Sequence, residues 1–130
     1  MYFCLGELYM KSEKGQSLVE FALIVPLLVL LLIGIVDFSR IFHAYLTIDH
    51  SGREAARAAS IGKDEVTIKS IAVNQGASIG LTASQVNVNT GSSGSNATIT
   101  ITYQVTFLTP LIGKIVNPLT LKDTTTMRVE

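Results

Sequence analysis

The most prominent feature of the chain is an unbroken apolar run, Phe21 to Val36, which reads FALIVPLLVLLLIGIV and contains no charged residue. As an α-helix these residues would extend about 24 Å, somewhat less than the roughly 30 Å hydrocarbon core of a bilayer. Leu18 and Val19 lengthen the apolar stretch on one side, and Phe38 does so on the other. Because the run is apolar all round, the pattern predicts a transmembrane helix, which we place over residues 16–37.

Two other interpretations of this run remain open. A cleaved secretory signal would need a small-x-small site after the run, but Val36 is followed by Asp-Phe-Ser-Arg. The first Ala-x-Ala, Ala56 to Ala58, comes about 20 residues later, beyond several charges. The buried core helix of a soluble protein would need more chain to cover it than the sequence supplies. We therefore favour a retained, single-pass anchor.

The helical pattern continues after the apolar run, but there it becomes one-sided. Apolar and small residues recur at spacings of three and four, which is typical of an amphipathic helix. They are Phe38, Ile41, Phe42, Tyr45, Ile48, Gly52, Ala55, Ala56 and Ala59. The pattern predicts one helix from about Ser17 to Ser60, ended by Gly62, whose second half buries this stripe.

The remaining sequence predicts one further helix and a small sheet. The helix would begin after Asp64 as N-cap and reach about Gln75, with Ile68, Ile71 and Ala72 facing inward. Apolar residues then alternate with polar ones, mostly threonine, in a short strand at 86–88, a long one at 97–107 and a third at 119–129. We expect an α+β fold in which the amphipathic half of the long helix covers an antiparallel sheet of about three strands, forming an extracytoplasmic domain over 38–130.

Charge and residue chemistry argue against several classes of function. Ten Lys and Arg balance ten Asp and Glu, so a nucleic-acid partner is not expected. The single cysteine, Cys4, excludes an intrachain disulfide.

His43 and His50 are too far apart along a helix to share one metal ion, and His50 with Glu54 lacks a third ligand. No catalytic cluster is evident, so we expect no enzyme activity, cofactor, metal or small-molecule substrate. Glu54 and Arg57 are expected to form an ion pair within the helix.

The residues around the start of the apolar run carry a recognisable pattern. A short basic leader ending in Lys14-Gly15 is followed by Gln16-Ser17-Leu18-Val19-Glu20, and the chain resembles type IV pilin-like proteins at this point. The wider stretch from Gly15 to Gly62, with its GQSLVEFALIVP opening, IVDFSR step and REAAR segment, resembles the TadE family of minor pseudopilins in Tad/Flp (type IVb-like) pilus systems. The ending Met127-Arg128-Val129-Glu130 is also similar to that family.

This resemblance implies a processing site and a set of partners. A prepilin peptidase would cut between Gly15 and Gln16, removing residues 1–15 as a leader, and Glu20 would become the fifth mature residue and act in assembly. The partners would be membrane lipid, other pilin or pseudopilin subunits and the Tad secretion machinery. The resemblance places the protein in the bacterial cytoplasmic membrane, N-terminus inside and C-terminal domain outside. We also expect translation to start at Met10, which would give a short hydrophilic leader.

The residues themselves allow a second interpretation of Glu20. Ser17 and Glu20 have the spacing of a capping box at a helix start, and an acidic residue in a first turn suits the helix dipole. Gln16 and Glu20 lie one turn apart on the same face, so Glu20 could also pair with the new amine of a neighbouring subunit. The alternative function is a membrane-tethered binding module that is neither cleaved nor part of a filament.

Overall fold

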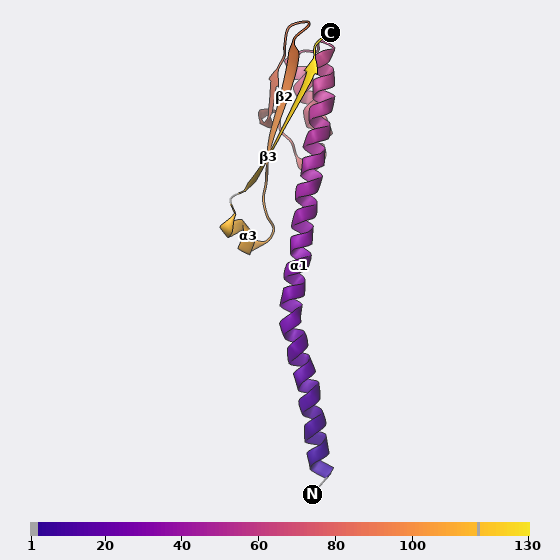
Figure 1. Ribbon diagram of the computed structural model, residues 1–130, viewed down its shortest axis with the longest axis vertical. Coiled ribbons are helices and arrows are strands. Elements are labelled where there is room, and N and C mark those ends of the chain that lie inside the picture. Colours follow the sequence, from indigo (N-terminus) through magenta and orange to yellow (C-terminus); the bar gives the residue numbers. More distant parts are fainter. Residues whose placement is uncertain (1–2, 117) are drawn as a thin grey trace. The chain divides into compact units, whose positions relative to one another are not determined.

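The computed structural model describes residues 3–116 and 118–130, with side chains described for 13–110, 112–116 and 118–130. The elements follow one another along the chain as shown in Figure 1. They are α1 (Phe3–Ser60), α2 (Glu65–Gln75), the short 3₁₀ turns η1 (Ala77–Ile79) and η2 (Ala83–Gln85), β1 (Val86–Asn89), β2 (Asn96–Val105), α3 (Pro110–Ile115) and β3 (Leu119–Arg128). This order of helices and strands confirms the predicted α+β class.

The chain divides into two compact units, Met1–Val36 and Asp37–Glu130. The first unit consists of the N-terminal part of α1, including the whole apolar run. The second unit holds the remainder of α1 and every other helix and strand among the described residues.

The start of α1 differs from the prediction. The helix begins at Phe3 rather than near Ser17, because the leader is rich in good helix formers such as Leu, Glu and Lys and contains no proline. Ser17 consequently lies inside the helix, where its hydroxyl donates to the Glu13 carbonyl at 3.2 Å. The capping box expected at Ser17 is therefore wrong for the uncut chain.

The end of α1 agrees with the prediction. The last helical residue is Ser60, and Gly62 adopts a left-handed conformation with φ of 76°. The Gly62 N–H donates to the Ala59 carbonyl, and the Lys63 N–H donates to the Ala58 carbonyl. Glycine terminates helices in this way because it reaches positive φ without a steric penalty.

The sheet has the order β1-β2-β3, with both pairs antiparallel. β2 and β3 pair along their whole length, from Asn96 opposite Arg128 to Val105 opposite Leu119. β1 is shorter and pairs with the middle of β2. The three strands and the predicted alternation of their buried residues are confirmed.

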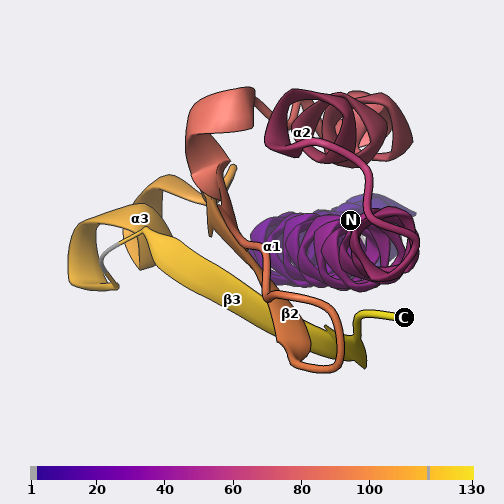
Figure 2. The same cartoon turned by 90° about the horizontal axis from the view of Figure 1, so that it is seen from above.

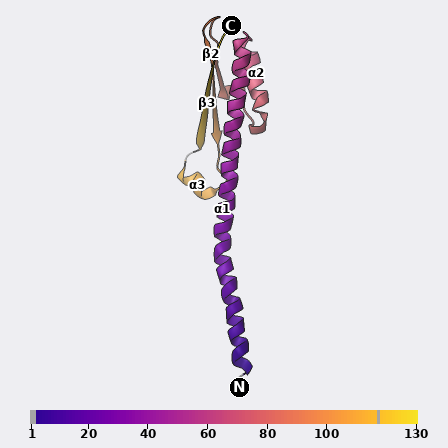
Figure 3. The same ribbon diagram turned by 45° about the vertical axis from the view of Figure 1, so that its right-hand side comes forward.

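The core of the second unit lies between the sheet and two helices. Figures 2 and 3 show α2 and the C-terminal half of α1 on the same side of the sheet. Four isoleucines, one from each helix and two from β2, are fully buried there; they are Ile48, Ile68, Ile99 and Ile101. The predicted cover of the sheet by the amphipathic half of α1 is thus confirmed.

Helix α1 packs closely against the sheet at Gly52. A Cβ built at Gly52 would lie 2.7 Å from Asp123 Oδ2, 3.0 Å from Thr125 Oγ1 and 3.8 Å from Ile101 Cδ1. A side chain at this position would require the Asp123 carboxylate and the Thr125 hydroxyl to shift. Glycine therefore sets how near the helix and β3 can come.

The aromatic part of the predicted stripe is not buried. Phe38, Phe42 and Tyr45 are each at least half exposed, whereas Ala44, between them in sequence, is buried. The helix presents its small residues to the sheet, so the aromatic rings fall on its flank. The predicted burial of Phe38, Phe42 and Tyr45 is therefore wrong, because helical periodicity finds an apolar stripe without showing what covers it.

Candidate functional site

Gly15 lies inside α1, at the boundary between the polar leader and the residues that precede the apolar run. A Cβ built at this glycine would meet no atom within 4 Å, and its φ is not positive. Neither packing nor backbone geometry therefore requires a glycine here. Glycine in a helix interior costs about 0.5–1 kcal/mol relative to alanine, so it weakens α1 at this point.

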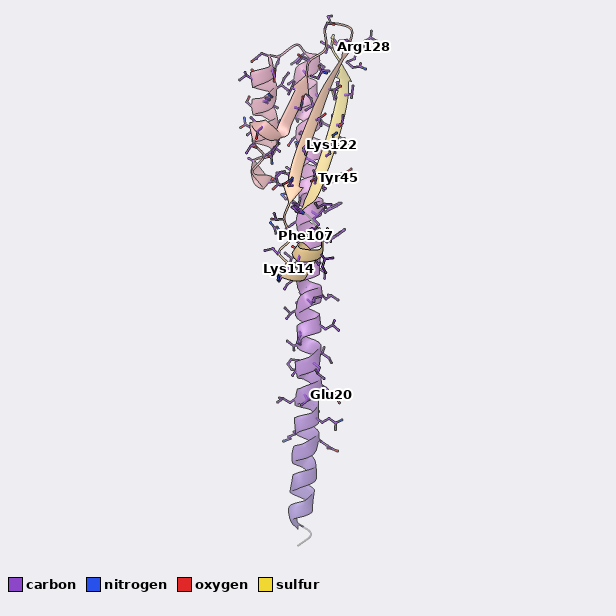
Figure 4. The ribbon with its side chains drawn as sticks, turned by 90° about the vertical axis from the view of Figure 1, so that its left-hand side faces the viewer. Glu20, Tyr45, Phe107, Lys114, Lys122 and Arg128 are labelled. Atoms are coloured by element: carbon purple, nitrogen blue, oxygen red, sulfur yellow. The ribbon has the colours of Figure 1, made fainter. Side chains whose placement is uncertain are left out.

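Gln16 and Glu20 lie together on one face of α1, as their spacing predicts. The Gln16 side-chain amide donates to Glu20 Oε1 at 3.4 Å, and both residues are exposed. Figure 4 shows the Glu20 side chain projecting outward from the helix. The carboxylate is therefore within reach of the residue that would become the N-terminus after a cut at Gly15, and it is open to other molecules.

Most side chains of the apolar run that follows are exposed. The helix from Glu13 is long and apolar enough to cross a membrane, and none of its most apolar 18-residue window is buried. Leu23, Leu27 and Phe21 each expose about 70% of their surface. A core helix of a soluble protein would bury such side chains, so this alternative is disfavoured, and the run has the properties of a membrane anchor.

Asp37, the first charged residue after the apolar run, is buried and holds a distant segment of the chain. Its Oδ1 accepts from the Leu108 N–H at 2.8 Å, and its Oδ2 accepts from the Thr109 N–H at 3.0 Å. The Thr109 hydroxyl also donates to Oδ2. Three hydrogen bonds to one carboxylate compensate for its removal from water. We call this arrangement the Asp37 clamp; it fixes the start of the 108–116 segment next to α1.

The role of Asp37 was not predicted from the sequence. The signal was a lone carboxylate directly after a long uncharged run, a position where a charge needs a partner. The partner could not be deduced, because Leu108 and Thr109 are more than 70 residues away along the chain.

A small surface hollow of about 220 Å³ lies between α1, η1 and β2 in the second unit. Arg40 and His43 line it from α1, and Tyr103 lines it from β2. The Tyr103 hydroxyl is occupied, because it donates to the Ile79 carbonyl at 2.8 Å. The hollow therefore combines polar side chains from α1, η1 and β2, including the Ser78 hydroxyl.

The other polar residues of α1 form local pairs. Arg53 Nη2 lies 3.0 Å from Asp49 Oδ2, one turn earlier on the helix. The expected pair of Glu54 with Arg57 does not occur among the described residues. In the same described part of the chain, no three His, Cys, Asp or Glu side chains are close enough to hold a metal ion.

Asp64 caps α2 as predicted and supplies a pH-dependent contact. The Thr67 hydroxyl donates to its carboxylate and, with the Thr67 N–H, lowers the pKa of Asp64 below its ordinary value.

Because the pKa of Asp64 is lowered in the folded state, its ionised carboxylate stabilises the fold at pH values above the unfolded-state pKa of about 3.9. This stabilisation is lost as the pH falls through the folded-state pKa. We expect the protection factor of the Thr67 amide to fall over that acidic range. Asp64→Ala should lower it at neutral pH as well; equal protection in both proteins would contradict the cap.

Comparison with known proteins gives one match. The model of the family described as TadE-like protein matches residues 15–57, which begin at Gly15 and end within α1. Neither the curated proteins nor the solved structures that were compared give a match. The resemblance noted in the GQSLVEFALIVP, IVDFSR and REAAR segments is confirmed, because residues 15–57 match the model of the TadE-like family.

Proposed function

We propose that this Tad pilus-associated protein is a minor pseudopilin, which a prepilin peptidase cuts between Gly15 and Gln16. It acts by assembly rather than by catalysis. The leader lies in the cytoplasm, the apolar run crosses the cytoplasmic membrane once, and the α+β unit lies outside. The mature helix then packs against other pilin or pseudopilin subunits of the Tad machinery.

The observation that carries the proposal is the unexplained glycine at position 15. This residue opens the TadE-like match, yet the fold has no use for a glycine there. A peptidase does have a use for it, because a residue without a side chain lets an enzyme approach the backbone closely. The weakened helix also opens more easily for cleavage.

A cut at this position would also give Glu20 a new environment. Gln16 would carry a free α-amine, and Ser17 would lie at a helix start instead of inside a helix. The Ser17 and Glu20 side chains could then form the capping box that the uncut chain lacks. Since a carboxylate at the edge of an apolar helix is costly without a partner, the amine of a neighbouring subunit is a suitable counter-charge.

The test is the N-terminal mass of the protein extracted from membranes of cells with and without prepilin peptidase. We expect a chain that begins at Gln16 only when the peptidase is present. A chain that keeps its leader in both strains would overturn processing. The membrane-tethered binding module that is never cleaved would then be the better assignment.

A further inference from the structure

We propose that the segment 108–116, which contains α3, lies in the headgroup region of the lipid bilayer and forms a second membrane contact beside the anchor. We call this stretch the α3 segment. The inference rests on the membrane anchor, but it does not depend on cleavage at Gly15.

The α3 segment is an exposed apolar surface. Leu108, Ile112, Ile115 and Val116 expose between 37% and 82% of their surface, and Ile115 is the most exposed of them. The only charged residue of the segment is Lys114. Figure 1 shows α3 beyond the ends of β2 and β3, where the strands no longer cover it. Several apolar side chains gathered without cover mark a site of interaction.

The Asp37 clamp attaches the α3 segment to α1 at residue 37. Asp37 directly follows Val36, the last residue of the apolar run, and its carboxylate binds the N–H groups of Leu108 and Thr109. Thr109 is buried, so this attachment is shielded from water. The α3 segment therefore begins beside Asp37, the residue that directly follows the apolar run in sequence.

Two aromatic residues of α1 add to the same apolar region. Phe38 and Phe42 stack with ring centres 6.4 Å apart, and both rings are more than half exposed. Phe42 is five residues beyond Asp37, or about 7.5 Å along the helix. That distance equals the thickness of one interfacial layer, roughly 5–8 Å on each side of the core.

Two properties favour lipid over a protein as the occupant. The apolar run alone is about 6 Å shorter than a typical hydrocarbon core, and a short span draws flanking apolar surface into the bilayer. Lys114, which Figure 4 labels on α3 near Phe107, supplies the cation that lipid phosphates attract. An apolar surface with one flexible cation, continuous with an anchor, matches a headgroup layer.

The inference can be tested with a single tryptophan, because the natural chain contains none. The full chain with Ile115→Trp is reconstituted in phosphatidylcholine and phosphatidylglycerol vesicles, with and without brominated phosphatidylcholine. Val66→Trp is the matched control, since Val66 on α2 is 76% exposed, compared with 82% for Ile115. Leu30→Trp, inside the apolar run, reports whether the anchor itself is in the bilayer.

We expect brominated lipid to quench Ile115→Trp at least about threefold more strongly than Val66→Trp, with emission shifted to the blue. Equal quenching of these two variants, with Leu30→Trp strongly quenched, would overturn the inference and leave the anchor intact. A blue shift at Ile115→Trp without quenching would show that the chain itself or a second copy covers this residue, and it would also overturn the inference. An unquenched Leu30→Trp would overturn the anchor and the inference together.

Discussion

Replacing Gly15 with leucine is expected to leave almost all of the protein uncut in cells that contain prepilin peptidase. The substitution removes a helix-weakening glycine and places a large side chain beside the bond to be cut, in a position that the fold leaves open. Excluding a side chain from an active-site pocket changes a rate by about tenfold to several hundredfold. The ratio of mature to full-length protein, measured by intact mass, should fall by at least about tenfold.

Gly34→Leu is the matched control for this variant. Gly34 also lies inside α1, and a Cβ there also meets no atom within 4 Å, but it is far from the proposed cut. We expect Gly34→Leu to be processed like the natural protein. If Gly15→Leu is processed equally well, cleavage occurs at another bond or not at all.

Glu20→Gln separates assembly from processing in the same experiment. The amide keeps the shape of Glu20 but cannot form an ion pair with an α-amine. We expect normal removal of the leader but about tenfold less cross-linking to other pilus subunits, the effect of losing about 1.4 kcal/mol. Glu13→Gln is the control, because residue 13 leaves with the leader. Normal assembly of Glu20→Gln would refute the role of Glu20 while leaving the cleavage proposal standing.

A leucine at position 52 is expected to destabilise the α+β unit severely. Its first side-chain atom alone would lie 2.7 Å from Asp123 Oδ2 and 3.0 Å from Thr125 Oγ1. These two side chains are themselves joined by a hydrogen bond, so neither can move aside without losing a contact. Overpacking of this kind costs about 1–3 kcal/mol, and the larger value would remove much of the stability of a small domain.

The measurement is thermal unfolding of the full chain in detergent micelles. We expect Gly52→Leu to lower the melting temperature of the α+β unit by about 10 °C or more. Gly113→Leu in α3 is the control, because a Cβ at Gly113 meets no atom within 4 Å. Melting of both variants at the same temperature would show that α1 and β3 are not in close contact at Gly52.

The parts of the fold that the sequence predicted are those governed by local periodicity. The alternation from Ala97 to Val105 gave β2 its buried face, and Asp64 and Gly62 marked helix ends because each has a specific chemistry at a terminus. The apolar run was identified by its composition alone. None of these features requires knowledge of which distant residues meet.

The parts that could not be predicted depend on contacts between distant residues. The Asp37 carboxylate accepts hydrogen bonds from Leu108 and Thr109, which are 71 and 72 positions away. No local pattern at residues 108–109 indicates that their N–H groups bind a carboxylate on α1. The exposure of Phe38 and Phe42 depends on where the strands end, so it could not be read from helix spacing. For the proposed site, the positions of Gly15 and Glu20 were predicted from the family pattern. That no neighbouring side chain requires a glycine at position 15 is evident only from the folded structure.

The pairing of β3 joins parts of the α+β unit that are far apart along the chain. β3 pairs with β2 along its whole length, and the Glu130 N–H donates to the Ser60 carbonyl at the end of α1. Contacts between residues so distant in sequence form only after a long loop has closed. We therefore expect the core of this unit to close late in folding, after α1 and α2 have formed.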